Sequence, residues 1–167
     1  MTDPKDIGIV IRTAIVGDVP VMAELINDFA SQGQMLPRSH HNLYQCIRAF
    51  YVATSQGAVV GCGALQVIWS DLAEVRSLAV DKARQGRGAG QLILESLLNE
   101  ARDLGLPRIF ALTYQQPFFQ RMGFQVVPRE SLPHKIWADC LDCPKFTKCD
   151  ETAMMVDLGM KEEKREG

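Results

Sequence analysis

The chain has 167 residues, 47% hydrophobic and 23% charged, which suits one well-buried domain and is too short for two of ordinary size. Its 18 basic and 20 acidic side chains leave a formal charge of -2, which argues against a nucleic-acid partner. The sequence has neither the apolar core of a secretory signal nor an apolar run as long as a membrane span. We therefore expect a cytoplasmic protein with no membrane partner, one domain over 1–160, and a charged tail over 161–167 that does not pack.

The spacing of apolar residues predicts the elements in chain order. A strand at 9–14 leads to a helix with Asp18 as its N-cap, and Ser39 precedes a second helix. The remaining predicted elements are strands at 50–55, 58–69 and 73–80, a helix at 88–104, a strand at 108–113, a short helix at 115–122, and strands at 124–128 and 151–158. This order predicts a mixed α/β (α+β) fold, a strongly twisted mixed sheet covered by helices.

Three glycines lie between a predicted strand and the long helix, at Gly86, Gly88 and Gly90. Backbone N–H groups at such a helix start can approach phosphate oxygens closely, and the helix dipole attracts negative charge. A nucleotide P-loop would need Lys and then Ser or Thr after the last glycine, where Gln91 and Leu92 stand. The three preceding strands, at 50–55, 58–69 and 73–80, are expected to form an antiparallel meander. The turn therefore does not follow a first parallel strand, which argues against a dinucleotide fold. The alternative is that the glycines only bend a tight turn.

The run at 85–90, QGRGAG, resembles the Q/R-x-x-G-x-G/A signature of the GNAT superfamily of N-acetyltransferases. Residues 11–26 resemble the opening strand and helix of that superfamily, and 118–124 resemble its late helix-to-strand element. The resemblance implies a GNAT fold whose central strands splay apart around acetyl-CoA. It also implies two sets of cofactor-binding residues: Gln85, Gly86, Arg87, Gly88, Ala89 and Gly90 for the pyrophosphate, and Leu78, Ala79 and Val80 for the pantetheine arm.

Acetyl transfer needs a neutral amine, so a base must remove a proton directly or through water. Glu74 is our candidate base, because strand alternation would place it on the same face as Arg76 and Leu78. The alternative is that Glu74 only pairs with Arg76 or with solvent. Thr113 is a candidate to hold a relay water.

Tyr114 is our candidate acid for the departing thiolate. The family often has a tyrosine in the late helix, where this chain has Phe119. A phenyl ring cannot donate a proton. Either Tyr114 or solvent therefore takes that role, or no general acid is needed.

Residues 35–52, 61–80 and 131–155 resemble the short bacterial N-acetylglutamate synthases, which make the first intermediate of arginine biosynthesis. That resemblance implies glutamate or glutamine as the acceptor. A dicarboxylate or its amide needs cationic groups, and Arg suits a carboxylate best. Arg38 with Ser39 is the first candidate pair, followed by Arg76 and Lys135. The alternative is that Arg38 is an ordinary solvated side chain at a helix start.

Cys140, Cys143 and Cys149 have the spacing C-x2-C-x5-C, with His134 upstream and Asp150 directly after. Three thiolates and one further ligand would make a structural zinc site. The alternative is that these thiols pack as small apolar groups. The chain has five cysteines and no export signal, so we expect reduced thiols and not a disulfide framework.

Two other functions stay open at this stage. The same fold would also suit another amine acceptor, such as a peptide N-terminus, a lysine or a polyamine. A protein of this fold that binds CoA without catalysis would instead be a sensor or a partner subunit. A homodimer is consistent with the size of the chain, although no residue in the sequence requires one.

Overall fold

The computed structural model describes residues 8–132 and 151–159. Its strands are β1 (Ile9–Thr13), β2 (Phe50–Ser55), β3 (Ala58–Trp69), β4 (Leu72–Val80), β5 (Arg108–Thr113), β6 (Gln125–Val126) and β7 (Thr152–Asp157). Its α-helices are α1 (Val19–Ser31), α2 (His40–Gln45), α3 (Ala89–Asp103) and α4 (Gln116–Arg121). Short 3-10 turns are η2 (Val16–Asp18), η3 (Ile47–Ala49), η4 (Lys82–Arg84) and η5 (Arg129–Ser131). The predicted order of strands and helices is confirmed, although α2 and β6 are shorter than expected.

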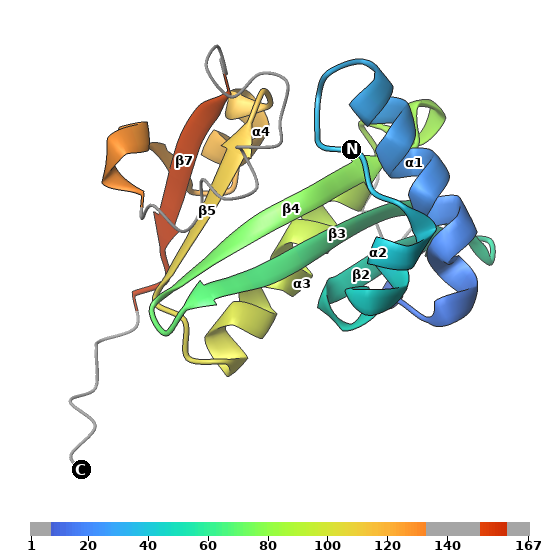
Figure 1. Ribbon diagram of the computed structural model, residues 1–167, viewed down its shortest axis with the longest axis horizontal. Coiled ribbons are helices and arrows are strands. Elements are labelled where there is room, and N and C mark those ends of the chain that lie inside the picture. The colour runs from blue at the N-terminus through green and yellow to red at the C-terminus, as the bar shows by residue number, and fades with distance from the viewer. Residues whose placement is uncertain (1–7, 133–150, 160–167) are drawn as a thin grey trace. The chain divides into compact units, whose positions relative to one another are not determined.

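The strands form one mixed sheet in the order β1-β2-β3-β4-β5-β7-β6 (Figure 1). β1 pairs antiparallel with β2, and β2 pairs antiparallel with β3. The parallel pairing of β4 with β5 joins Leu72–Glu74 to Arg108–Phe110, although β4 continues to Val80 and β5 to Thr113. On its other side, β5 pairs antiparallel with β7 over its full length, Arg108–Thr113. The mixed sheet predicted from the sequence is therefore present.

The chain divides into two compact units. Of the described residues, unit 1 comprises 8–66 and 75–99, and unit 2 comprises 67–74, 100–132 and 151–159. Unit 1 thus holds α1, α2, the last part of β4 and most of α3. Unit 2 holds the first residues of β4 together with β5, α4, β6 and β7.

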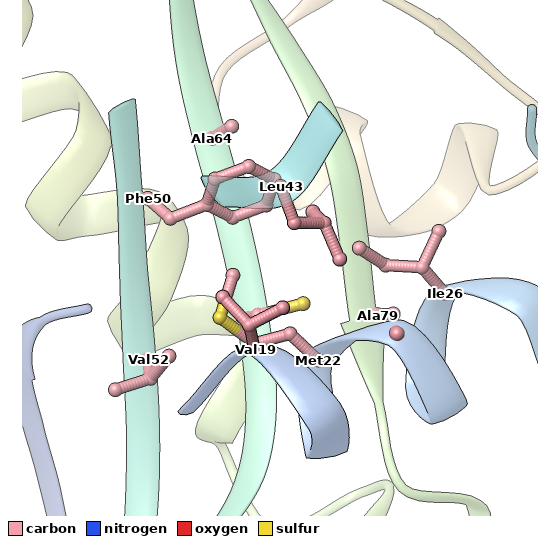
Figure 2. Packing of buried hydrophobic residues seen from close by; sticks show 10 residues of the cluster. Val19, Met22, Ile26, Leu43, Phe50, Val52, Ala64 and Ala79 are labelled. Atoms are coloured by element: carbon pink, nitrogen blue, oxygen red, sulfur yellow. The ribbon is translucent and has the colours of Figure 1, made fainter. Parts of the chain in front are cut away.

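In unit 1, α1 and α2 pack on one face of the sheet (Figure 2). Met22 and Ile26 of α1 and Leu43 of α2 are fully buried, as expected from their helical spacing, whereas Val21 is 38% exposed. They meet side chains from three neighbouring strands, namely Phe50, Val52, Ala64 and Ala79. Each large apolar side chain buried in this way contributes about 1.5–3 kcal/mol. This cluster therefore fixes where α1 lies on the sheet.

The long helix α3 packs on the opposite face, and two glycines of β3 let it approach closely. A β-carbon on Gly63 would lie 2.8 Å from Ile93 Cγ2 and 3.0 Å from Leu78 Cδ1. A β-carbon on Gly61 would lie 3.0 Å from Ile93 Cδ1. Because successive strand residues face opposite sides, the intervening Cys62 joins the cluster beneath α1. The absence of side chains at Gly61 and Gly63 thus sets the distance between β3 and α3.

Unit 2 has a smaller core on one face of β4 and β5. Leu72, Phe110, Leu132 and Ala153 are buried together there. Leu112, two residues after Phe110, is half-buried against the same cluster. The side chains of Leu72, Phe110 and Leu112 therefore define one face of the paired strands.

Asp18 has a different role from the predicted helix cap. It precedes α1, but its carboxylate makes no capping bond to that helix. It accepts two bonds from Arg12, of 2.7 and 2.9 Å, and one of 2.8 Å from the Ile15 amide. The bonds from Arg12 hold the pKa of Asp18 below its usual range, outweighing the effect of burial. Asp18 thus fastens the end of β1 to the chain that enters α1.

Asp18→Asn is expected to lower the free energy of unfolding at pH 7 by about 2 kcal/mol, because bonds to a buried charged group are lost. A depressed folded-state pKa stabilises the protein above the unfolded pKa of about 4, and this stabilisation disappears as pH falls. Between about pH 5 and about pH 2, an interval that contains the unfolded pKa, the variant should therefore lose less stability than the parent protein. Urea denaturation across this range measures both effects. Glu24→Gln, an exposed change on α1, is the control, and an equal loss in both variants would contradict the assigned role.

Candidate functional site

The glycine loop connects β4 to α3 and is braced by its own hydrogen bonds. Asp81 Oδ1 accepts from the Ala83 amide at 3.0 Å, and Gln85 Nε2 donates to the Val80 carbonyl at 3.2 Å. Gly86 and Gly88 have φ values of 82° and 89°. Residues with a β-carbon rarely adopt such values, which explains glycine at both positions. These bonds and the two positive φ values define the shape of the loop.

The start of α3 adds backbone donors and positive charge to this loop. The first helical bond runs from the Leu92 amide to the Gly88 carbonyl at 3.0 Å, so the amides at 89–91 precede the intrahelical ladder. Arg84 and Arg87 line a shallow depression beside the loop, together with Ile9, Ser55 and Val60. Amides at a helix N-terminus with nearby guanidinium groups favour an anion such as a diphosphate.

Arg38 lies in the irregular segment between α1 and α2, and Asn27 of α1 holds its backbone. The Arg38 amide donates to Asn27 Oδ1 at 2.9 Å, and Asn27 Nδ2 donates to the Arg38 carbonyl at 2.8 Å. One side-chain amide thus bonds both polar groups of one residue. This gives Arg38 a fixed backbone position without help from a helix or a strand.

The guanidinium of Arg38 is held separately. Its Nε donates to Ser77 Oγ at 2.7 Å, and its Nη1 donates to Asn42 Oδ1 at 2.8 Å. Its Cζ lies 5.4 Å from the centre of the Phe50 ring, within the range of a cation–π contact. Ser39, a predicted substrate contact, caps α2 by accepting from the Asn42 amide at 3.0 Å. Arg38 is therefore oriented at both ends and is not an ordinary solvated side chain.

Ser77 has a left-handed backbone, with φ of 54°, in the middle of β4. Its carbonyl accepts from the buried Cys62 thiol at 3.6 Å. Burial raises the pKa of Cys62 to about 12, and the nearby Arg38 charge and an Ala79 backbone bond offset this only in part. Cys62 is therefore a neutral thiol at physiological pH and does not cancel the positive charge of Arg38.

The left-handed Ser77 also changes the expectation for Arg76. The prediction that Arg76 and Leu78 share a face assumed regular alternation, and Ser77 interrupts the pleat between them. Leu78 lies beside Gly63 beneath α3, and Arg76 Nη1 donates to Gln66 Oε1. The structure thus gives Arg76 a partner on β3 and does not gather it with Leu78.

Glu74 is only 8% exposed, and its position in the ladder is opposite Phe110. Because it is two residues from Leu72, alternation places it on the face that Leu72 and Phe110 define. Thr113 is three residues beyond Phe110 and therefore falls on the other face, about 10 Å along the strand. Its Oγ1 accepts from the Gln115 amide at 2.8 Å. The structure thus does not bring Thr113 to the side of Glu74.

The aromatic residues near α4 have different environments. Phe119, which stands where the family often has tyrosine, is 4% exposed and packs edge-on against Phe118 and Phe124. Its ring is part of the core. Tyr114 follows β5 and is half-buried. Of these residues only Tyr114 has a hydroxyl that can donate a proton.

Several predicted ligands lie outside the described residues. These are Lys135 and the cysteines Cys140, Cys143 and Cys149. Within 8–132 and 151–159, no cluster of three His, Cys, Asp or Glu residues is arranged to hold a metal ion. In the same residues no helix is both long and apolar enough to cross a bilayer.

Three residues that hold Arg38 were not predicted from the sequence. Asn27 and Ser77 are 11 and 39 positions from Arg38, and a single sequence carries no signal for such distant pairs. Asn42 is nearer to Arg38 in the sequence, in the first turn of the helix that follows Ser39. Its position in the sequence is consistent with a helix start, but it gives no sign that Asn42 bonds the Arg38 guanidinium.

Residues 47–126 match the family model described as an acetyltransferase (GNAT) domain. The chain is 38% identical to an uncharacterised N-acetyltransferase of Chlorobaculum tepidum over 148 residues, which are 89% of this chain and 96% of that protein. The chain belongs to the GNAT acetyltransferase family. This acetyltransferase is also 37% identical to an amino-acid acetyltransferase of Mycobacterium tuberculosis over 162 residues, or 95% of this chain and 86% of the relative.

Solved structures agree with this family. A Mycobacterium tuberculosis protein crystallised in complex with CoA has a TM-score of 0.81 and 35% identity, covering 89% of this acetyltransferase and 99% of that chain. An N-acetylglutamate synthase of Neisseria gonorrhoeae, complexed with coenzyme A and N-acetyl-glutamate, has a TM-score of 0.82 and 30% identity. That match covers 90% of this chain but 35% of the longer synthase. The expected GNAT fold is confirmed.

Gly86→Ala is expected to raise the KM for acetyl-CoA about tenfold, because a β-carbon at positive φ strains the loop by about 1 kcal/mol or more and moves its amides. The added β-carbon itself meets no atom within 4 Å. Gly105→Ala is the matched control, with φ of 80°, the same open surroundings and a place just after α3. Steady-state kinetics and thermal unfolding should show similar destabilisation in both variants. A KM increase in both, or in neither, would contradict a donor-binding loop.

Proposed function

We propose that this acetyltransferase transfers the acetyl group of acetyl-CoA to the α-amino group of L-glutamate or L-glutamine. The product of the glutamate reaction, N-acetylglutamate, would enter arginine biosynthesis. The observation that carries the acceptor assignment is the anchored guanidinium of Arg38. The amino-acid acetyltransferase of Mycobacterium tuberculosis and the Neisseria gonorrhoeae synthase support the same assignment by similarity.

Arg38 suits an acceptor that carries a carboxylate. A guanidinium has five N–H donors in a planar fork, which matches the two oxygens of a carboxylate. Ser77 and Asn42 fix the plane of this fork, and the neutral Cys62 leaves its charge in place. A polyamine would instead be repelled by Arg38, because both carry positive charge.

The glycine loop suits the donor. Acetyl-CoA supplies the acetyl group as a thioester, and its diphosphate carries negative charge. The amides at 89–91 and the side chains of Arg84 and Arg87 provide the donors and the positive charge that a diphosphate requires. The carboxyl end of β4, at 78–80, would hold the pantetheine arm by main-chain bonds.

Glu74 would act as the base. The acceptor arrives as an ammonium, and Glu74 takes one of its protons directly or through water. The neutral nitrogen then forms the new N–C bond to the acetyl carbonyl carbon and gives up a second proton to solvent, and the C–S bond breaks to leave the amide. The thiolate leaves and takes a proton from Tyr114 or from solvent.

The first test compares glutamate, glutamine, lysine and spermidine as acceptors, following free CoA thiol and identifying products by mass. We expect turnover with glutamate or glutamine. Arg38→Ala should lower kcat/KM for that acceptor about 100-fold, as for loss of a charged hydrogen-bonded contact worth about 3 kcal/mol. Arg48→Ala, an exposed arginine of η3, is the control and should keep normal kinetics. Turnover of lysine or spermidine alone would contradict the proposal.

The second test concerns Glu74. Glu74→Gln keeps the size of the buried side chain but cannot accept a proton, so kcat should fall by a factor of about 100 or more. The pH–rate profile should change, because the carboxylate that takes the proton is gone. The KM for acetyl-CoA should stay within about twofold, because the change does not touch the glycine loop. An unchanged pH profile would exclude Glu74 as the base.

A further inference from the structure

We propose that Asn27 is a positioning residue that sets the affinity for the acceptor by acting through Arg38. This inference rests on the proposed function, because it assumes that Arg38 binds the acceptor carboxylate. Asn27 itself is assigned no contact with substrate. Its contribution is to hold the main chain from which the guanidinium extends.

The geometry singles out Asn27 because its side-chain amide bonds both backbone polar groups of Arg38. Its carbonyl oxygen accepts from the Arg38 amide, and its NH2 group donates to the Arg38 carbonyl. These bonds replace the ladder that a helix or strand would otherwise provide for that residue. Without them both polar groups of the Arg38 backbone would need new partners, and the segment would shift to find them.

A shift of the Arg38 backbone would move its guanidinium. The long side chain loses rotamer freedom when it is ordered, so its orientation depends on restraints at both ends. Ser77 and Asn42 restrain the head of the side chain, and Asn27 restrains its base. A displacement of about 1 Å at a binding group is enough to reduce turnover up to 100-fold.

Asn27 owes its own position to the core of unit 1. It follows Ile26, which is fully buried beneath α1, and lies one turn after Ala23, which is 5% exposed. The packing of α1 on the sheet therefore determines where the Asn27 amide points. The backbone of α1 thus connects the apolar core to Asn27, and two hydrogen bonds connect Asn27 to the residue that carries the proposed acceptor-binding group.

The test is a double-mutant cycle between Asn27→Ala and Arg38→Ala, with kcat/KM measured for the acceptor and KM measured for acetyl-CoA. In the parent protein Asn27→Ala should lower acceptor kcat/KM about tenfold and leave the acetyl-CoA KM within about twofold. In the Arg38→Ala background the same change should have an effect of less than about twofold, because the group it positions is gone.

Two further variants keep the result interpretable. Glu24→Ala, an exposed change one turn earlier on α1, should leave all constants unchanged. Asn27→Gln retains the amide but displaces it by one methylene, so it should fold and show a smaller loss than Asn27→Ala. Thermal unfolding of each variant verifies that the native fold is compared.

The outcomes separate this inference from the proposed function. If the parent protein acetylates neither glutamate nor glutamine, the proposed function fails and this inference fails with it. If the parent turns over its acceptor but Asn27→Ala has the same effect with and without Arg38, the inference alone is overturned. Equal changes in the KM values of acceptor and acetyl-CoA would also overturn it, since they indicate a general structural defect.

Discussion

The hydrogen bond from Arg38 Nε to Ser77 Oγ joins an irregular segment to the strand that leads into the glycine loop. Ser77 makes this bond from a left-handed backbone, a conformation that costs a residue with a β-carbon about 1–2 kcal/mol. The surrounding contacts offset that cost, because Ser77 also accepts the Cys62 thiol and bonds a cation. Strain of this kind is often found at functional sites. Ser77 thus connects the proposed acceptor-binding guanidinium to the strand that leads into the glycine loop.

Burial and charge compete at two places in unit 1, with opposite results. At Asp18 the bonds from Arg12 dominate, so the carboxylate is stabilised in its charged form. At Cys62 burial dominates despite Arg38 nearby, so the thiol stays neutral. The difference follows from geometry: Arg12 makes two direct bonds to the carboxylate, whereas Arg38 donates to Ser77 and Asn42. The Asp18 carboxylate is thus held charged by a directly bonded guanidinium, whereas the Cys62 thiol stays neutral.

Much of this fold follows from periodicity in the sequence. The antiparallel strands, the long helix and the start of α2 after Ser39 were predicted because each depends on residues close together in the chain. The glycine loop was also predicted, since positive φ at Gly86 and Gly88 has a recognisable residue type. Ser77 has the same backbone class without glycine, and nothing in the sequence marks it. The bidentate role of Asn27 depends on a contact across 11 residues and became visible only in three dimensions.

The proposed donor site uses backbone groups of the chain, whereas the proposed acceptor site uses side chains. The glycine loop offers backbone amides, which every residue type supplies, so donor binding constrains conformation more than side-chain identity. The acceptor site depends on one guanidinium held by particular side chains, so it constrains identity. Substitution at Arg38 or its partners would therefore change which acceptor the protein binds, while leaving the glycine loop intact. A single fold can serve many amines on this principle, because specificity lies in a few side chains placed on a common framework.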